Sequence, residues 1–128
     1  MSATESVSVQ MKEILDEYVD KVDKVSKESM NAVAKEAVQQ LKATSPKGSK
    51  HRRKYAEGWT TKKEGDDTVI VHNKTNYQLT HLLENGHVVR PTPTHPNRKS
   101  RVAGIKHIAP VEQWANEEFQ IRISRGLS

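Results

Sequence analysis

The sequence predicts an α+β fold: one domain over residues 1–128 with a long N-terminal helix, a small antiparallel β-sheet, a short central helix and a C-terminal helix. Three observations lead to this prediction. Residues 10–45 contain neither glycine nor proline and carry a helical apolar period. Residues 55–73 hold two β-rich runs around one turn, and a second helical period follows Pro110. A sheet this small cannot be a wound parallel sheet, which leaves the α+β class.

The N-terminal helix is expected from about Gln10 to Ala43, after a flexible polar segment over residues 1–9. Its apolar stripe starts at Met11 and advances in alternating steps of four and three residues. Such a helix is about 50 Å long at 1.5 Å per residue, more than a domain of this size can cover. We expect either a kink near residues 26–29 or packing against neighbouring subunits. The expected subunit contact consists of Leu15, Tyr18, Val22 and Val25.

A β-hairpin follows a basic loop. Serine, proline and glycine predict that residues 44–54 form a mobile loop rich in lysine and arginine. The first strand is expected within residues 55–63 and the second over residues 68–73, with the turn at residues 64–67. Because side chains alternate along a strand, every second residue of the second strand shares one apolar face.

The second half of the chain is expected to hold two helices around another basic loop. Residues 77–85 form the short central helix, which Gly86 ends. A short strand over residues 87–90 returns to the sheet, and a proline-containing basic loop covers residues 90–106. The closing helix begins with Pro110 as its first residue and ends near Ser124. Its large aromatic side chains are expected to pack beneath the hairpin: Trp114 and Phe119.

Composition limits the classes of protein. Hydrophobic residues make up 34% of the chain, so a lone subunit has a thin core and partner subunits would supply further burial. The net charge is +5, from 21 basic and 16 acidic side chains, which suits a polyanion or an acidic protein surface. The absence of cysteine excludes disulfides and thiolate sites. No apolar run is long enough for a membrane span or signal peptide, so we expect a soluble intracellular protein.

Catalytic and metal-binding chemistry is not expected. Four of the six histidines fall within residues 81–107, but their spacing matches no zinc signature, and a surface or capping role is the stronger interpretation. A metal-dependent nuclease needs clustered carboxylates, whereas the acids lie mostly on the outer face of the long helix. No glycine-rich elbow or phosphate loop is present. We therefore expect no enzyme activity, no metal and no cofactor.

The two basic loops are the stronger functional signal. Their cations suit sequence-independent contact with phosphates, although they could equally meet an acidic protein surface. Few aromatic residues lie between them, so a stacking platform for single strands is not expected. The candidate DNA-facing or docking residues are Lys50, Arg52, Arg53 and Lys54 in the first loop and Arg98, Lys99 and Arg101 in the second.

One motif resembles a known family. A tyrosine precedes His-Leu-Leu-Glu-x-Gly at residues 81–86, a basic loop follows, and His-x-x-Pro at residues 107–110 opens the closing helix. This order resembles the small neck proteins of tailed bacteriophages, the head–tail joining or tail-completion family that prophages also carry. The likeness extends over nearly the whole chain, and this sequence departs from the pattern at Asn85 and His87.

The resemblance implies a structural role. Such proteins form homo-oligomeric rings, six- or twelve-fold, between the portal-side connector and the tail tube, with other neck proteins as neighbours and phage DNA in transient contact. The implied location is the neck of the virion, after assembly in the host cytoplasm, with no membrane partner. A small basic, sequence-independent DNA-binding protein is the alternative.

Physical roles can be assigned within the motif. Leu82 and Leu83 anchor the short helix, Gly86 takes a left-handed cap, and His81 and Glu84 bond to adjoining backbone. The first basic loop is expected to face the DNA channel, because serine and glycine give it reach without a fixed shape. The second, stiffened by prolines, is expected to dock on a neighbour. A position of both loops on the outside is the competing arrangement.

Overall fold

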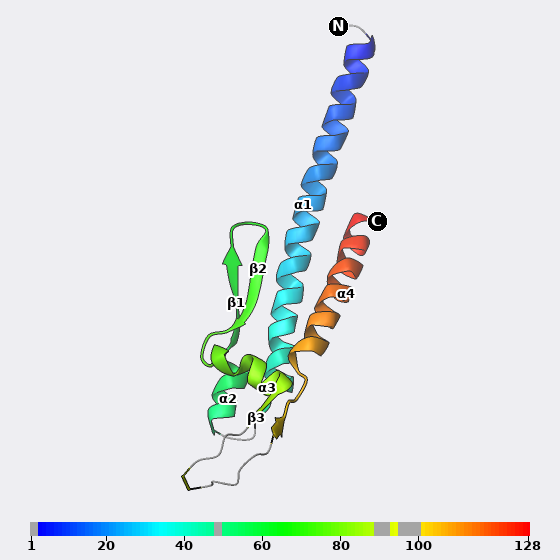
Figure 1. The fold of residues 1–128 in the computed structure, drawn as a ribbon. Coiled ribbons are helices and arrows are strands. Elements are labelled where there is room, and N and C mark those ends of the chain that lie inside the picture. Colours follow the sequence, from blue (N-terminus) through cyan, green and yellow to red (C-terminus); the bar gives the residue numbers. More distant parts are fainter. Residues whose placement is uncertain (1–2, 48–49, 89–92, 95–100) are drawn as a thin grey trace.

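The computed structural model describes residues 3–47, 50–88, 93–94 and 101–128, without the side chains of residues 3–6 and 50–53. It confirms the α+β class (Figure 1). The elements in chain order are α1 (Ala3–Thr44), α2 (Lys50–Glu57), β1 (Trp59–Glu64), β2 (Thr68–Asn73), the 3₁₀ turn η1 (Tyr77–Leu79), α3 (Thr80–Asn85), β3 (Gly86–Val88), β4 (Arg101–Ala103) and α4 (Ile108–Leu127).

Helix α1 is a single continuous helix of 42 residues and begins earlier than the sequence predicts. Residues 3–9, which the sequence predicts as a flexible segment without a helical period, form the first turns of α1. Each residue added to an existing helix gains a backbone hydrogen bond, and nothing in residues 3–9 interrupts that gain. The kink near residues 26–29, one of the two alternatives for this long helix, is not found, in keeping with a sequence that has no proline or glycine there (Figure 1).

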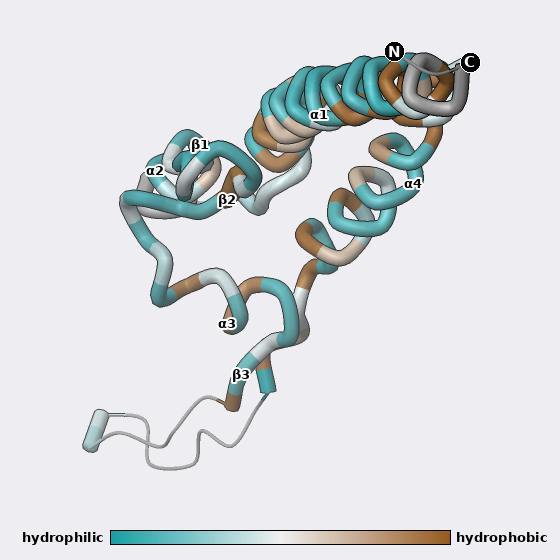
Figure 2. Tube along the Cα trace, turned by 90° about the horizontal axis from the view of Figure 1, so that it is seen from above, coloured by the Kyte–Doolittle hydropathy of each residue, from teal (hydrophilic) through white to brown (hydrophobic). Residues whose placement is uncertain are grey.

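The hairpin and α4 both pack against helix α1. The antiparallel hairpin of β1 and β2 lies along one side of α1, and α4 lies along another (Figure 2). The hairpin register runs from Trp59 opposite Asn73 to Glu64 opposite Thr68. The expectation that α4 packs beneath the hairpin is wrong, because α4 makes its main contact with α1. Trp114 is half-buried against the core rather than enclosed by it.

Residues 50–57 form helix α2 and not the end of a loop. The segment contains good helix formers, and its two apolar residues, Tyr55 and Ala56, are buried against the rest of the molecule. Helix α2 therefore takes the place of the expected start of the first strand, which begins at Trp59. The expected loop cations Lys50, Arg52, Arg53 and Lys54 consequently lie on a helix.

The remaining short elements form a second sheet. Strand β3 pairs antiparallel with β4, from Gly86 opposite Ala103 to Val88 opposite Arg101, and does not join the hairpin as expected. Part of the expected second basic loop is thus the strand β4, while Arg98 and Lys99 lie outside the described residues. Gly86 has φ 82° and ψ 175°, a conformation essentially restricted to glycine. The positive φ confirms the expected helix stop, but the extended ψ differs from a left-handed cap.

The core is small and lies at the C-terminal end of α1. Its central cluster joins α1, α2, β1 and α4 through five buried side chains: Ala37, Leu41, Tyr55, Trp59 and Val111. Half-buried apolar residues from β2, η1 and α3 surround it, including Val71, Leu79 and Leu83. Helix α4 begins two residues before its expected start, so Pro110 is the third helical residue and still lies in the first turn, where a missing N–H costs nothing.

Candidate functional site

A buried polar trio joins three separate elements beneath the core. Tyr55 comes from α2, Glu84 from α3 and His107 from the residue before α4. The hydroxyl of Tyr55 lies 2.6 Å from Nε2 of His107. On the other side of the ring, Nδ1 lies 2.7 Å from the carbonyl oxygen of Ile105 and 3.1 Å from Oε1 of Glu84. Since both of these are acceptors, Nδ1 carries the proton of the neutral ring, and Nε2 accepts a hydrogen bond from Tyr55.

Glu84 caps the N-terminus of α4. Its Oε1 accepts hydrogen bonds from the backbone N–H of His107 at 2.7 Å and of Ile108 at 2.8 Å, and Oε2 accepts from Ala109 at 2.9 Å. The first N–H groups of a helix have no partner within the helix, and its positive end attracts a carboxylate. Burial raises the pKa of Glu84, but the N–H donors of Ile108, His107 and Ala109 outweigh that effect, and the pKa is lowered overall.

The trio holds the fold together and is closed to substrates. Tyr55 is 0% and His107 1% exposed, so no substrate can reach either group. Burial, followed by the nearby charge of Glu84, raises the pKa of Tyr55 to about 12, which keeps the phenol protonated at neutral pH. A phenol that stays protonated is a hydrogen-bond donor and a poor nucleophile. The described residues also contain no group of three or more His, Cys, Asp or Glu that could hold a metal ion.

Further hydrogen bonds fasten the elements next to the trio. The indole N–H of Trp59 donates to the hydroxyl of Ser45 at the end of α1, over 2.8 Å. The side-chain amide of Asn73, which ends β2, donates to the carbonyl of Tyr55 at 2.6 Å. Its oxygen accepts from the backbone N–H of Thr75 and Asn76. Asn73 thus turns the chain from the hairpin toward η1 while tying it to α2.

The motif residues named from the sequence have different positions. Glu84 does bond to backbone, as predicted, but to a segment more than twenty residues further along the chain. Leu82 and Leu83 are half-buried, and Leu83 packs against the core cluster. His81 is exposed. Sequence reasoning missed Tyr55, Asn73 and the buried role of His107; only His107 had a signal, in its position before the helix-opening Pro110.

The N-terminal half of α1 extends beyond the other elements (Figure 1). Every side chain from Val7 to Lys21 is exposed. Seven of them are large and apolar; Val9 is 47% exposed, and the other six are 53–65% exposed: Val7, Met11, Ile14, Leu15, Tyr18 and Val19. We call these six residues the exposed stripe. Of the expected subunit contact, Leu15 and Tyr18 belong to it, whereas Val22 and Val25 are half-buried, Val25 closely beside Gly126 of α4.

An apolar groove runs beside the C-terminal half of α1. Two adjoining cavities of about 390 and 350 Å³ share lining residues from α1, β2 and α4. The floor is α1, the valines of β2 form one wall, and α4 forms the other. We call this surface the groove, and its main lining residues are Ala34, Ala37, Val69, Val71, Val111, Ala115 and Phe119.

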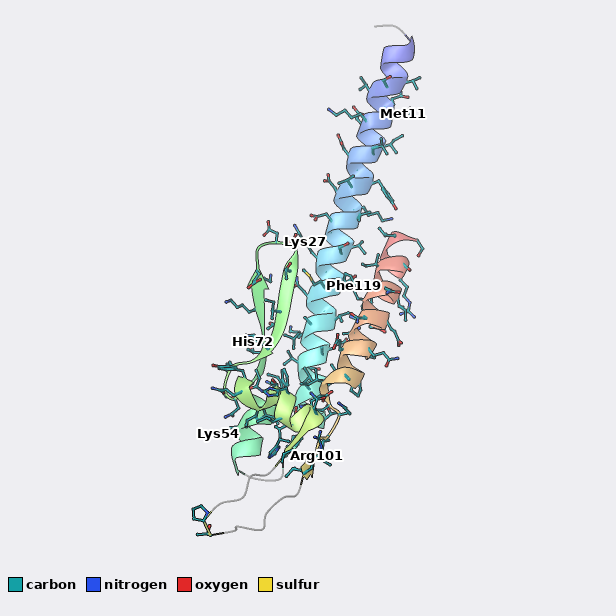
Figure 3. The ribbon with its side chains drawn as sticks, viewed as in Figure 1. Met11, Lys27, Lys54, His72, Arg101 and Phe119 are labelled. Carbon is teal, nitrogen blue, oxygen red and sulfur yellow. The ribbon has the colours of Figure 1, made fainter. Side chains whose placement is uncertain are left out.

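Two of the expected loop cations, Lys54 and Arg101, lie at the end of the molecule opposite Met11 (Figure 3). Lys54 is exposed on α2. Arg101 of β4 donates to the carbonyl oxygen of Asn85 at 2.9 Å, and Lys106 donates to the side chain of the same residue at 2.7 Å. Arg101 thus connects β4, and Lys106 the segment after β4, to the last residue of α3. No helix in the described part of the chain combines the length and apolar character needed to span a membrane.

Comparison with known families relates the chain to a described family. A family model described as "Bacteriophage HK97-gp10, putative tail-component" matches residues 10–86, more than half of the chain. The matched region extends from α1 to the glycine after α3, so it includes most of the exposed stripe together with Tyr55 and Glu84, and it ends before His107 and α4. No curated protein and no solved structure gives a significant match.

Proposed function

Because the chain belongs to the HK97-gp10-like family of bacteriophage tail components, we propose that it is a structural protein of a phage or prophage neck. In this proposal it forms a homo-oligomeric ring, six- or twelve-fold, that joins the DNA-filled head to the tail and takes part in tail completion. It catalyses no reaction, and its partners are neighbouring neck, portal-side connector and tail-tube proteins. It assembles in the host cytoplasm and remains in the neck of the virion.

The exposed stripe is the observation that carries this proposal. Six large apolar side chains on one half of α1 are more than half exposed. Each such side chain gains about 1.5–3 kcal/mol when it is fully buried, so their exposure favours association. A contiguous exposed apolar surface is typical of a protein–protein contact. The closed trio of Tyr55, Glu84 and His107 supports a structural role in addition, because its hydrogen bonds all connect elements of the fold.

The mass of the assembly tests the proposal. We expect sedimentation or native mass spectrometry to find a discrete high-order species, and electron microscopy to show it as a ring. Replacing Leu15 and Tyr18 by Asp should abolish that species while leaving the helix content unchanged. Exchanging the charged, exposed Glu13 for Gln on the same helix is the matched control and should leave assembly intact. A wild-type protein that is monomeric at all concentrations would contradict the ring.

Transient contact with DNA is the second part of the proposal. The basic residues of α2, Lys50, Arg52, Arg53 and Lys54, would meet the phosphates of DNA in the ring's channel. Such contacts are screened within about 8 Å at physiological salt, which lets DNA pass without being held. Exchanging all four for Gln should leave assembly intact and change DNA retention or ejection in particles. Failed assembly of the particles would instead make α2 a docking element for another protein.

The alternative function is a small basic DNA-binding protein. It predicts a dimer with tight DNA binding that weakens steeply with salt, because each phosphate contact releases counterions. A neck ring predicts weak DNA affinity together with a large assembly. Measuring mass and DNA affinity across a salt series on the same preparation therefore distinguishes the two functions.

A further inference from the structure

The chain carries two large apolar surfaces that its own fold leaves open. The exposed stripe lies on the N-terminal half of α1, and the groove lies between β2 and α4 beside the C-terminal half of the same helix. We infer that the exposed stripe of one subunit lies in the groove of the next subunit. This inference rests on the proposed ring and names the contact that would close it.

The two surfaces match in length. The stripe extends from Val7 to Val19, about 18 Å at the helical rise of 1.5 Å per residue. The floor of the groove extends along α1 from Met30 to Leu41, about 17 Å by the same measure. A helix laid along the groove would therefore cover its full length and would bury its own apolar face at the same time.

The stripe must meet a different copy of the chain. Helix α1 has no glycine or proline between Ala3 and Thr44, so its N-terminal half cannot fold back onto its C-terminal half. The floor of the groove is α1 itself. A contact between two different surfaces of identical subunits is heterologous, and it closes into a ring when the rotation between subunits allows it. Pairing of one stripe with another would instead give a two-fold dimer.

The stripe continues an apolar surface that already packs against a helix. Helix α4 covers α1 as far as Val25, where Gly126 lies close to that side chain. The stripe ends at Val19, three residues before Val22, and the half of α1 that carries it extends beyond the other described elements of the subunit (Figure 1). A neighbouring α4 and hairpin would extend the same kind of packing along the rest of the helix.

Charge also favours a second copy as the partner. Residues 7–21 carry four acidic and two basic side chains, a net charge of −2, while the rest of the chain has a net charge of +7. The charged residues that line the groove are Asp67 and Glu112, and a further small cavity beside its upper end is lined by Lys27, Lys63 and Asp66. The acidic extension of one subunit and the rest of another carry opposite net charges, which favours their encounter, while the apolar surfaces determine where the two subunits touch.

Cross-linking between introduced cysteines tests this contact. The chain has no cysteine, so a variant with Leu15→Cys on the stripe and Ala115→Cys in the groove carries only these two thiols. Treatment of the full-length variant with a short bismaleimide should give a ladder of bands at multiples of 14.5 kDa on a denaturing gel. The matched control pairs Glu13→Cys, on the opposite face of α1, with Ala115→Cys, and should lose the ladder.

Each other result overturns the inference in a distinct way. Cross-linked dimers from Leu15→Cys alone would show that stripes pair with each other. A large assembly without a ladder from the Leu15→Cys and Ala115→Cys pair would keep the ring but place the contact elsewhere. A variant and wild type that are both monomeric by mass would overturn the contact and the ring together.

Discussion

The two halves of α1 differ in what surrounds them. The C-terminal half is surrounded by α2, the hairpin and α4, and Tyr55 and Trp59 are buried there. Buried hydrogen bonds join elements in this region that are distant in sequence. Around the N-terminal half, all side chains from Val7 to Lys21 are exposed, including large apolar ones. The C-terminal half of α1 thus contributes to the core of the subunit, whereas its N-terminal half is exposed. Stability and assembly should therefore respond to different substitutions.

The largest effect on stability is expected from Trp59→Ala. Trp59 is 5% exposed, packs edge-on against Tyr55 at 5.6 Å between ring centroids and donates to Ser45. Removing a buried Trp side chain costs about 3–5 kcal/mol of unfolding free energy. Urea unfolding of the variant and the wild type at one fixed protein concentration measures this loss of unfolding free energy. Tyr77→Ala, at an aromatic residue that is 66% exposed, is the control and should change stability by less than about 0.5 kcal/mol.

The next effect is expected from Glu84→Gln. Gln keeps one carbonyl oxygen but loses the charge that three backbone N–H groups share, and hydrogen bonds to charged groups contribute about 1.5–3 kcal/mol each. We expect a loss of that order at neutral pH, with α4 the first element to lose protection in hydrogen exchange. Unchanged protection of α4 would contradict the capping role.

The pH dependence of the same variant sharpens this prediction. Because the folded-state pKa of Glu84 is lowered, its contribution to stability is fully present above the unfolded pKa, near 4.5, and is lost as the pH falls through the folded pKa. The wild type should therefore lose more stability on acidification than Glu84→Gln does. Unfolding midpoints of both proteins across an acidic pH series provide the measurement, and parallel curves would assign the acid sensitivity to other groups.

A smaller loss is expected from Trp114→Ala. Trp114 is only half-buried at the margin of the core, so its removal should cost about half of the 3–5 kcal/mol typical of a buried aromatic side chain. Comparison with Trp59→Ala under identical conditions measures the difference. Equal losses for the two tryptophans would mean that Trp114 is enclosed more fully than in the single subunit.

The smallest effect on the subunit itself is expected from Leu15→Asp with Tyr18→Asp. Both side chains are more than half exposed, so the unfolding free energy of the dissociated subunit should change by less than about 0.5 kcal/mol. Thermal unfolding of both proteins, diluted until each is monomeric, checks this. A large loss of stability would show that the N-terminal half of α1 contributes to the fold and is not a free surface.

Local patterns in the sequence predicted much of this structure. The apolar period of α1, the bounds of β2 and the stop at Gly86 each depend on a few neighbouring residues. Helix α2 was missed because Lys50–Arg53 show no apolar period, and its two buried residues fall at its end. Their burial depends on contacts with α1 and α4, which no local pattern contains.

The contacts of the candidate site were less accessible from sequence. Tyr55 and His107 are 52 residues apart, and Glu84 caps a helix that begins more than twenty residues later. Neither spacing corresponds to a helical or strand period, so only the folded arrangement brings these groups together. The pairing of β3 with β4 could not be predicted for the same reason, because a long segment separates the two strands. The family resemblance identified the motif, and the structure shows which groups its residues bond to.

The packing of α4 on α1 also bears on the order of events during synthesis. The ribosome completes α1 long before it makes α4, and the two helices meet through contacts such as Arg122 with Glu36, 86 residues apart. The part of the α1 surface that α4 covers therefore stays open on the nascent chain until α4 has emerged. Contacts of such long sequence separation slow folding, because a large loop must close first. Nascent chains on one messenger would have their first helices free to meet one another, so the early-made part of each chain would need protection until its own α4 arrives.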